Sequence, residues 1–445
     1  MNKLNKVYFQ LPSWMQNLFL SIYAFYRDVF FRRNKYFSHG VNLVDRINSL
    51  SEKEIQDWQL KQLNSIVKYG IENTSFYKDY YGKNVVDFKS LSDFKKLKTI
   101  DKELVRKNYA SLQVEIKDKV FEVKTSGTTG SSLKIRVSQK TTAIERAGFY
   151  LSRSIGGYKK GDKLASFIGR KIMKNSISTP PYWRYNFYEK QLIFSNWHIS
   201  DESLPYYIDK YNKFKPKYVN GYPSFLYLFA EFALRSKKPL HKPEIIFTGS
   251  ETLLPYQRSV IEKAFCTKIL DHYGTAEHLI VAHQCLNGKY HVREEFGYLE
   301  VINNEVYATT FHNEAFPLIR YRVGDLIELS DEKCTCGLSG RIIEKIEGRK
   351  DDVVISKSGK KYGRISRIFQ DTPNVKEAQI IQKNKGKLLI KVVPQNEKKF
   401  SFEVIKSSVM DKLDDDFEVQ YEIVDKIPRT KSGKFRFVIS TIKQQ

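Results

Sequence analysis

The sequence predicts an α/β protein with a large N-terminal domain and a small C-terminal α+β domain. Between residues 120 and 330 short β-rich runs alternate with helical ones, a pattern typical of helices layered on a largely parallel sheet. From 296 to 330 the pattern changes to antiparallel strands with turns, and a separate set of strands and helices follows. We therefore place the N-terminal domain, layered α/β sheets with a small β-barrel-like part, at 1–347. The C-terminal domain, expected to be a mobile lid, is placed at 348–445.

The N-terminal domain begins with an amphipathic segment at 1–46. From Leu11 it reads LPSWMQNLFLSIYAFYRDVFFRRNKY, and polar residues interrupt its apolar run, which falls short of the roughly 20 apolar residues of a bilayer span. We expect no signal peptide, because no small-residue cleavage site follows an apolar core. Two interpretations stay open: residues 11–35 lie on a membrane interface, or they pack against the protein's own core. The apolar positions at helical spacing are Trp14, Leu18, Phe19, Ile22, Phe25, Tyr26, Phe30 and Phe31.

The remaining elements follow in order along the chain. Residues 47–118 are charged and helical in pattern, and the predicted strands after them are 163–169, 217–223, 244–250 and 268–274. Helices are predicted between these strands at 224–236 and 255–265. In the C-terminal domain helices are predicted near 363–371 and 401–415, next to β-rich runs such as KEAQIIQKNKGKLLIKVVP.

Composition limits the possible functions. The 445 residues are 41% hydrophobic, so a sizeable core can form, and the formal net charge is +25. Such an excess can serve nucleic acid, an anionic membrane or a polyanionic small molecule, but here it is spread along the chain, as solvated surface charge is. No nucleic-acid-binding module is recognisable, so we expect no nucleic-acid partner. Four cysteines are too few for a disulfide scaffold, so a reducing cytoplasm is predicted, with peripheral contact to the inner membrane face left open.

A loop rich in Ser, Thr and Gly follows the strand-like run FEVK. Glycine permits a close backbone approach, and the N–H and hydroxyl groups of such a loop can surround a polyphosphate. The order of residues is not that of a Walker loop, and by composition alone an ordinary surface turn is an alternative. The candidate phosphate-binding residues are Thr125, Ser126, Gly127, Thr128, Thr129 and Gly130.

Five motifs in register give this loop a context. TSGTTG at 125–130 resembles the phosphate loop of the adenylate-forming superfamily of acyl-CoA synthetases, adenylation domains and luciferases. YGTAE at 273–277 resembles its YGxTE motif, and YRVGDL at 321–326 resembles YRTGDL. GRKDD at 348–352 resembles the GRxDD hinge, and PRTKSGK at 428–434 resembles PRTxxGK. The fold and activity of that superfamily are therefore expected here.

The resemblance implies roles around ATP and Mg²⁺. The ring of Tyr273, followed by Gly274 and Thr275, covers adenine, and Glu277 supplies the oxygen ligand that Mg²⁺ prefers. The resemblance departs at Ala276, where the family usually has Ser or Thr. Thr275 compensates for this change, or phosphate and Mg²⁺ contacts are weaker.

The resemblance also implies roles for residues of the later motifs. The resemblance implies that Asp325 accepts hydrogen bonds from the ribose, that Arg349 assists it, and that Asp351 is the hinge. Lys434 is the implied catalytic residue, a cation for both carboxylate and phosphate, and the glycine before it lets the loop enter the site.

Two other segments are similar to superfamily pocket elements. Gly249, Ser250 and Glu251 resemble a GGE-type loop near adenine, although a helix N-cap is an equal alternative. Residues 221–224, GYPS, resemble the segment that flanks the acyl pocket.

The cysteines add a candidate metal site. Cys285, His291, Cys334 and Cys336 supply three thiols and one imidazole, the ligand set of a closed tetrahedral Zn²⁺ site, and unrelated free thiols are the alternative. A Cys and a His after YGxxE, with CxCG before GRxDD, resemble the phenylacetate–CoA ligase branch, which implies structural zinc. Within that branch, the N-terminal run and the length resemble CapK-like proteins of capsular-polysaccharide loci. Cys266 is left over and is expected in the core.

The resemblance implies ATP-dependent activation of a small carboxylic acid as acyl-AMP with release of pyrophosphate. Transfer to CoA or another acyl acceptor then follows, in surface-polysaccharide biosynthesis. An aryl-CoA ligase of aromatic acid metabolism is the alternative, and a non-catalytic relative is supported by Ala276 alone. The sequence identifies neither the acid nor the acceptor, and it does not predict an oligomeric state.

Overall fold

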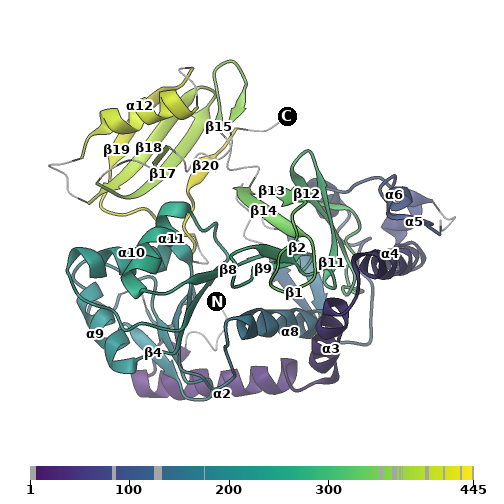
Figure 1. Cartoon of the computed structure of the whole chain (residues 1–445), viewed down its shortest axis with the longest axis horizontal. Coiled ribbons are helices and arrows are strands. Elements are labelled where there is room, and N and C mark those ends of the chain that lie inside the picture. The colour runs from purple at the N-terminus through teal and green to yellow at the C-terminus, as the bar shows by residue number, and fades with distance from the viewer. Residues whose placement is uncertain are drawn as a thin grey trace. The chain divides into compact units, whose positions relative to one another are not determined.

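The protein was analysed as a computed structural model, which divides into two compact units. Unit 1 comprises Met1–Ser21, Gly161–Ile269 and Glu347–Gln445, and unit 2 comprises Ile22–Lys160 and Leu270–Ile346 (Figure 1). The structure describes residues 7–82, 87–124, 133–174, 176–349, 354–362, 368–369, 372, 374–395, 400–413, 416–430 and 433–442. The predicted division at residue 348 stays a prediction.

Unit 1 contains a mainly parallel sheet covered by helices. Its strands lie in the order β7-β6-β3-β5-β4, parallel except for the antiparallel pair of β4 and β5. Almost every side chain of α10 is buried, as expected for a helix that is apolar all round. These elements are β3 (Leu164–Phe167), β4 (Trp183–Asn186), β5 (Gln191–Phe194), α9 (Leu204–Phe214), β6 (Tyr218–Gly221), α10 (Pro223–Arg235), β7 (Ile245–Gly249) and α11 (Pro255–Phe265).

The last part of unit 1 is an α+β fold with its own core, as predicted. Its four-stranded sheet has the order β19-β18-β17-β20, with β17 antiparallel to β18 and parallel to β20. Apolar residues of the sheet and of α12, such as Ile380, Ile390 and Ile405, form this core. The elements are β15 (Val354–Ile355), β16 (Lys361–Tyr362), β17 (Val375–Asn384), β18 (Lys387–Pro394), α12 (Phe402–Lys412), β19 (Glu418–Ile423) and β20 (Val438–Ser440).

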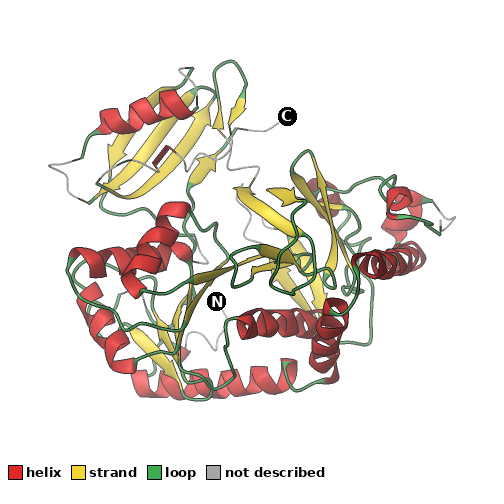
Figure 2. Cartoon of the chain, viewed as in Figure 1, coloured by secondary structure: helices red, strands yellow, loops and turns green. Residues whose placement is uncertain are grey.

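Unit 2 combines a helical layer with an antiparallel sheet whose strand order is β11-β12-β13-β14-β10-β9-β8 (Figure 2). The hairpin of β1 and β2 flanks the predicted phosphate loop. The helices are α3 (Lys35–Asn48), α4 (Glu52–Asn73), α5 (Ser75–Tyr81), α6 (Leu91–Phe94), α7 (Lys102–Lys107) and α8 (Gln139–Ile155). The strands are β1 (Val120–Lys124), β2 (Lys134–Ser138), β8 (Ile269–Gly274), β9 (Val281–Gln284), β10 (Tyr290–Val292), β11 (Gly297–Ile302), β12 (Glu305–Thr310), β13 (Tyr321–Ser330) and β14 (Ile342–Arg349).

Buried ion pairs fix the sheet of unit 2. Arg320 binds Glu300 through two hydrogen bonds of 3.0 and 2.8 Å, and the Arg341 side chain likewise holds Glu294 at 2.7 and 2.9 Å. Two-pronged pairs of this kind define the relative position of two segments more sharply than a single contact does. They therefore tie the residues that precede β13 and β14 to β11 and to the segment just before it.

The predicted strands and helices of unit 1 are confirmed, and one packing expectation is wrong. The predicted helix near 363–371 lies largely outside the described residues. Helix α2 (Ser13–Phe31) forms, with Leu20 buried and Phe19 packed against a core cluster, while the side chains of Trp14, Leu18 and Ile22 are exposed. Cys266 is exposed, not buried, because it ends α11 in a left-handed conformation at φ 51°. Among the described residues, no helix is long and apolar enough to cross a membrane.

Candidate nucleotide site and metal centre

The structure brings together two of the predicted nucleotide-binding residues in unit 2. The hydroxyl of Tyr273, near the end of β8, donates a 2.7 Å hydrogen bond to the Asp325 carboxylate on β13. Asp325 is buried, so this bond satisfies a polar group that burial would otherwise destabilise. The pair places an aromatic ring beside a carboxylate, the two groups that the sequence assigns to adenine and ribose.

The turn after β8 carries the predicted Mg²⁺ ligand. The Thr275 hydroxyl accepts a 3.1 Å hydrogen bond from the Leu279 N–H and so stabilises this turn, while Ala276 is exposed. Glu277 is only 3% exposed. Burial by itself lowers the pKa of His278, but Glu145 and Glu277 raise it above its usual value. The electrostatic potential at this turn is therefore negative, which favours the binding of a cation.

In unit 1 the predicted catalytic Lys434 follows a tight turn. The Gly433 N–H donates to the Thr430 carbonyl at 2.8 Å, and the Lys434 N–H donates to the Thr430 hydroxyl at 3.0 Å. Gly433 has φ 78°, and a Cβ built there would lie 2.8 Å from the Gly169 Cα. Only glycine fits this conformation and this close approach. That the glycine before Lys434 lets the loop enter the site stays a prediction.

Two side chains hold this turn from outside. The Asn196 amide donates a 2.8 Å hydrogen bond to the Gly433 carbonyl. The Glu251 carboxylate accepts the Phe435 N–H at 2.7 Å and the Ser224 N–H, in the first turn of α10, at 3.1 Å. Burial raises the pKa of Glu251, although both N–H donors oppose this shift. Asn196 belongs to none of the predicted motifs, and no signal in one sequence identifies it.

The GSE segment is thereby placed beside the Lys434 turn. Gly249 ends β7, and Ser250 follows in a left-handed conformation at φ 69°. The alternative that this segment caps a helix is wrong for α11, which begins at Pro255 with Leu254 as its N-cap. Glu251 instead supplies an acceptor to the first turn of α10, where backbone N–H groups have no partner within the helix.

Two further predicted residues end strands: Gly274 is exposed at the end of β8, and the backbone of Arg349 ends β14. Other predicted residues lie outside the described part of the chain. They are the hinge residue Asp351 and the whole phosphate loop, which consists of Thr125, Ser126, Gly127, Thr128, Thr129 and Gly130. Their roles stay predictions.

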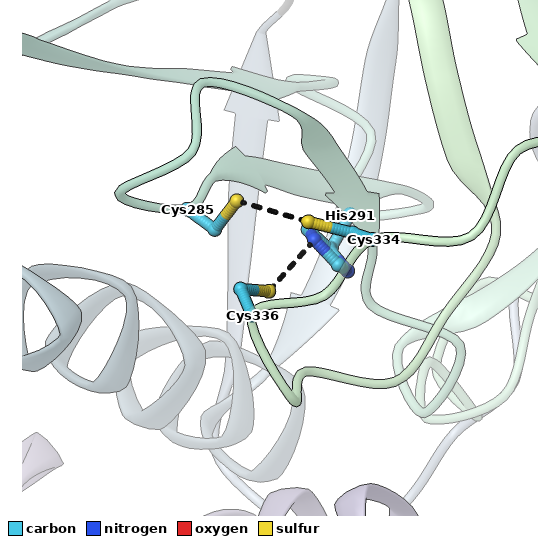
Figure 3. Close-up of side chains that lie close together, drawn as sticks. All are labelled: Cys285, His291, Cys334 and Cys336. Atoms are coloured by element: carbon cyan, nitrogen blue, oxygen red, sulfur yellow. Dashed lines mark hydrogen bonds between the residues drawn. The ribbon is translucent and has the colours of Figure 1, made fainter.

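The four predicted zinc ligands converge in unit 2. Cys285, His291, Cys334 and Cys336 point their ligand atoms toward one another, and all of these atoms lie within 4.8 Å of one another (Figure 3). The sulfur atoms of Cys285 and Cys334 are 3.7 Å apart, and the Cys336 sulfur lies 3.3 Å from the His291 Nε2. These spacings suit four ligands around one small ion, so the donor set fits Zn²⁺.

The surroundings of His291 favour metal binding. Its Nδ1 lies 3.1 Å from the Ser339 carbonyl, which leaves Nε2 directed at the cysteines. Burial lowers the pKa of His291, so the imidazole is neutral, the form that binds metals. Burial raises the pKa of the Cys336 thiol, which a bound cation would reverse.

Comparison with known proteins gives three findings. Residues 354–441 match the family model of the CapK C-terminal domain. The chain is 28% identical to Protein CapK of Staphylococcus aureus over 458 residues, which cover 99% of this chain and all of that protein. It is 26% identical to the phenylacetate-coenzyme A ligase of Aromatoleum evansii, over 70% of this chain and 74% of the relative.

Solved structures agree on the fold. The chain is similar to 2-hydroxyisobutyryl-CoA ligase, crystallised in the postadenylation state with an acyl-AMP, at a TM-score of 0.66 and 18% identity. The match covers 89% of this chain and 91% of the solved one. The predicted α/β fold with a C-terminal α+β part is confirmed.

Proposed function

We propose that this chain is a CapK-like AMP-forming ligase of the adenylate-forming superfamily, which activates a small carboxylic acid as its acyl-AMP and passes the acyl group to CoA or another acceptor. In the first step a carboxylate oxygen bonds to the α-phosphorus of ATP. The bond from that phosphorus to the bridging oxygen breaks, and pyrophosphate leaves. In the second step the acceptor attacks the acyl carbon, and AMP leaves.

Residues of each unit have separate tasks in this proposal. Lys434 offsets the negative charge that gathers on the carboxylate and phosphate in the transition state. The ring of Tyr273 contacts adenine, and the carboxylate of Asp325 accepts hydrogen bonds from the ribose hydroxyls. Glu277 would hold Mg²⁺, which supplies charge neutralisation at the phosphates when bound.

The observation that most directly supports the proposal is that two side chains bind the backbone of the Lys434 turn. Asn196 and Glu251 bind its backbone on both sides of Lys434, at Gly433 and at Phe435. A lysine at the end of a disordered basic tail would need no such contacts. They support a lysine whose position matters for chemistry.

The share of this chain that matches each relative favours a CapK-like role over a role in aromatic acid metabolism. The similarity to CapK extends over 99% of this chain, whereas the four phenylacetate-coenzyme A ligases match 70% to 77% of it. The last part of the chain also matches the CapK C-terminal model. This extent of similarity supports the proposed role in capsule or surface-polysaccharide biosynthesis, with an aryl-CoA ligase as the second candidate.

Zinc has a structural role in this proposal. Cys285 and His291 flank the turn between β9 and β10, and Cys334 and Cys336 follow β13. One ion bound by all four would tie the two connections together. It would thus stabilise the sheet that carries Asp325.

The test is ATP–pyrophosphate exchange with a panel of aryl acids, amino acids and sugar acids. We expect exchange that depends on one class of acid and disappears in Lys434→Ala. Lys426→Ala, an exposed lysine of the same domain, is the matched control and should retain full exchange. Exchange that survives in Lys434→Ala would refute the proposed role of that residue, and no exchange with any acid, together with no ATP binding by calorimetry, would refute adenylation.

The same assay separates the two candidates. Pyrophosphate release that requires phenylacetate, followed by CoA-dependent formation of AMP, would establish the aryl-CoA ligase. Exchange with a sugar acid or amino acid and none with aryl acids would favour the surface-polysaccharide role.

A further inference from the structure

Helix α2 is inverted relative to an ordinary surface helix: its polar side chains face the protein. In unit 1 the Asn17 side chain accepts the Tyr185 N–H at 2.9 Å, and the Ser21 hydroxyl accepts the Phe187 N–H at 2.9 Å. Gln16 is buried and donates to the Tyr8 carbonyl at 3.1 Å. These bonds fix the orientation of the helix about its axis.

The second half of α2 repeats this arrangement in unit 2. Asp28 is buried and forms ion pairs with Arg33 at 3.0 Å and Lys160 at 2.7 Å. It is the sole acidic residue in the α2 sequence, and Arg32, at 3.5 Å, is a third cationic partner. The outward face of α2 therefore has no negative charge.

That outward face is a continuous apolar stripe, which we call the α2 face. At about 100° per residue, its positions fall within an arc of roughly 80°. The exposed fractions of Trp14, Ile22 and Leu18 are 66%, 59% and 50%. Single exposed apolar residues are ordinary, but a stripe along a whole helix marks an interaction surface. The α2 face consists of Trp14, Leu18, Ile22, Phe25 and Val29, with Tyr26 at its edge.

Basic groups lie near both ends of α2, next to aromatic rings that are not part of the α2 face. Lys171 lies over the ring of Phe9, 5.7 Å from its centroid, just before the helix. Lys119 lies 4.9 Å from the centroid of Phe30, near the end of the helix. Arg33 and Lys35 follow in the sequence and are exposed. Apolar, aromatic and basic groups in this combination suit the interface of an anionic bilayer.

We propose that the α2 face inserts into the interfacial region of an anionic membrane, with α2 parallel to the membrane plane. The 19 residues of α2 give a contact about 28 Å long. Because the inward face is occupied by hydrogen bonds and ion pairs, docking needs no change in how α2 packs (Figure 1). The basic residues near the two ends of α2 favour anionic lipid over a neutral apolar partner, and a second copy of the chain is the competing occupant.

The test is flotation of the full-length protein with vesicles of phosphatidylglycerol and phosphatidylcholine, against vesicles of phosphatidylcholine alone. We expect binding to the anionic vesicles that weakens as salt is raised. Leu18→Glu with Ile22→Glu should weaken the partition coefficient at least about tenfold, since each change removes a large apolar side chain from the contact. Ile423→Glu, an equally exposed residue on β19, is the matched control and should bind as the wild type does.

Thermal unfolding separates a surface effect from misfolding, because substitutions at exposed positions should leave the melting temperature close to that of the wild type. Failure of the wild type to bind anionic vesicles would overturn the proposal, and so would equal binding by the double variant. Sedimentation velocity decides the competing case. If the double variant converts a dimer to a monomer, the α2 face joins two copies of the chain, and the membrane proposal is wrong.

Discussion

Gly433→Ala is the substitution that tests the Lys434 turn most sharply. The change adds a single methyl group and leaves Lys434 itself intact. The new Cβ would lie 2.8 Å from the Gly169 Cα and 3.2 Å from the Asn196 amide nitrogen. The first neighbour is backbone, which cannot rotate away, so the turn has to move.

The expected cost follows from two contributions. A non-glycine residue at φ 78° costs about 1–2 kcal/mol. Moving the turn breaks the hydrogen bond from Asn196 and weakens that of Glu251, at about 1 kcal/mol each. The total of about 3–4 kcal/mol lowers the docked population of the turn by roughly 150-fold to 900-fold.

Gly359→Ala is the matched control. Gly359 has φ 90° in the same C-terminal domain, but no atom lies within 4 Å of a Cβ built there. This variant carries the conformational cost without the collision. It should keep pyrophosphate exchange within about twofold of the wild type, since its strain lies outside the Lys434 turn.

Two measurements report on Gly433→Ala. Pyrophosphate exchange should fall nearly as far as in Lys434→Ala, and the melting temperature should fall by only a few degrees. Hydrogen exchange needs no substrate: the Phe435 N–H, which Glu251 accepts at 2.7 Å, should exchange faster in the variant. If the variant keeps both wild-type exchange activity and a protected Phe435 amide, the close approach to Gly169 has no role in the reaction, and the reasoning is refuted.

Three further predictions follow from the same structure. Tyr273→Phe removes the donor to Asp325 and should raise the KM for ATP about fivefold with kcat little changed, as steady-state kinetics will show. Cys336→Ser removes one of four convergent ligands and should lower the zinc content measured by mass spectrometry, with a lower melting temperature, whereas Cys266→Ser should change neither. Burial lowers the pKa of His312 to about 4, whereas its pKa in the unfolded chain is near 6.5. Between these two pH values only the unfolded chain binds the extra proton, so the free energy of unfolding decreases as the pH is lowered. Between neutral pH and about pH 5, the free energy of unfolding measured with urea should fall by about 2 kcal/mol less in His312→Gln than in the wild type, in which His272 and His283 also contribute. An identical pH slope in that variant would contradict this assignment.

Strand and helix positions were largely predictable because they depend on local pattern. The helix predicted at 255–265 is α11, and the helix predicted at 224–236 is shifted by one residue in α10. The four candidate metal ligands were also named from the sequence, because three thiols and one imidazole form the donor set of a tetrahedral Zn²⁺ site. Their convergence within 4.8 Å needed the structure, because β10 and the segment after β13 meet only in the folded sheet.

Other features could not be predicted from one sequence. Asn196 is a single polar residue after a buried strand, and only folding brings its amide to the Gly433 carbonyl. Glu251 was predicted near adenine, yet its carboxylate binds the backbone of α10 and of Phe435. A motif identifies the residue, but the partner of a side chain depends on segments distant in sequence.

The sequence by itself determined the order of the parts and the candidate site residues. Residue types and their spacing indicated the alternation of strands and helices and a candidate metal donor set, because each depends on short stretches of chain, and resemblance to known motifs supplied the candidate ATP-binding residues. Helix α2 marks the limit of that reasoning. Its amphipathic pattern predicted a helix with two faces, but not which face would be outside. The tertiary structure decided this, because hydrogen bonds from Tyr185 and Phe187 and the ion pairs of Asp28 turn the polar face inward and leave the apolar face exposed.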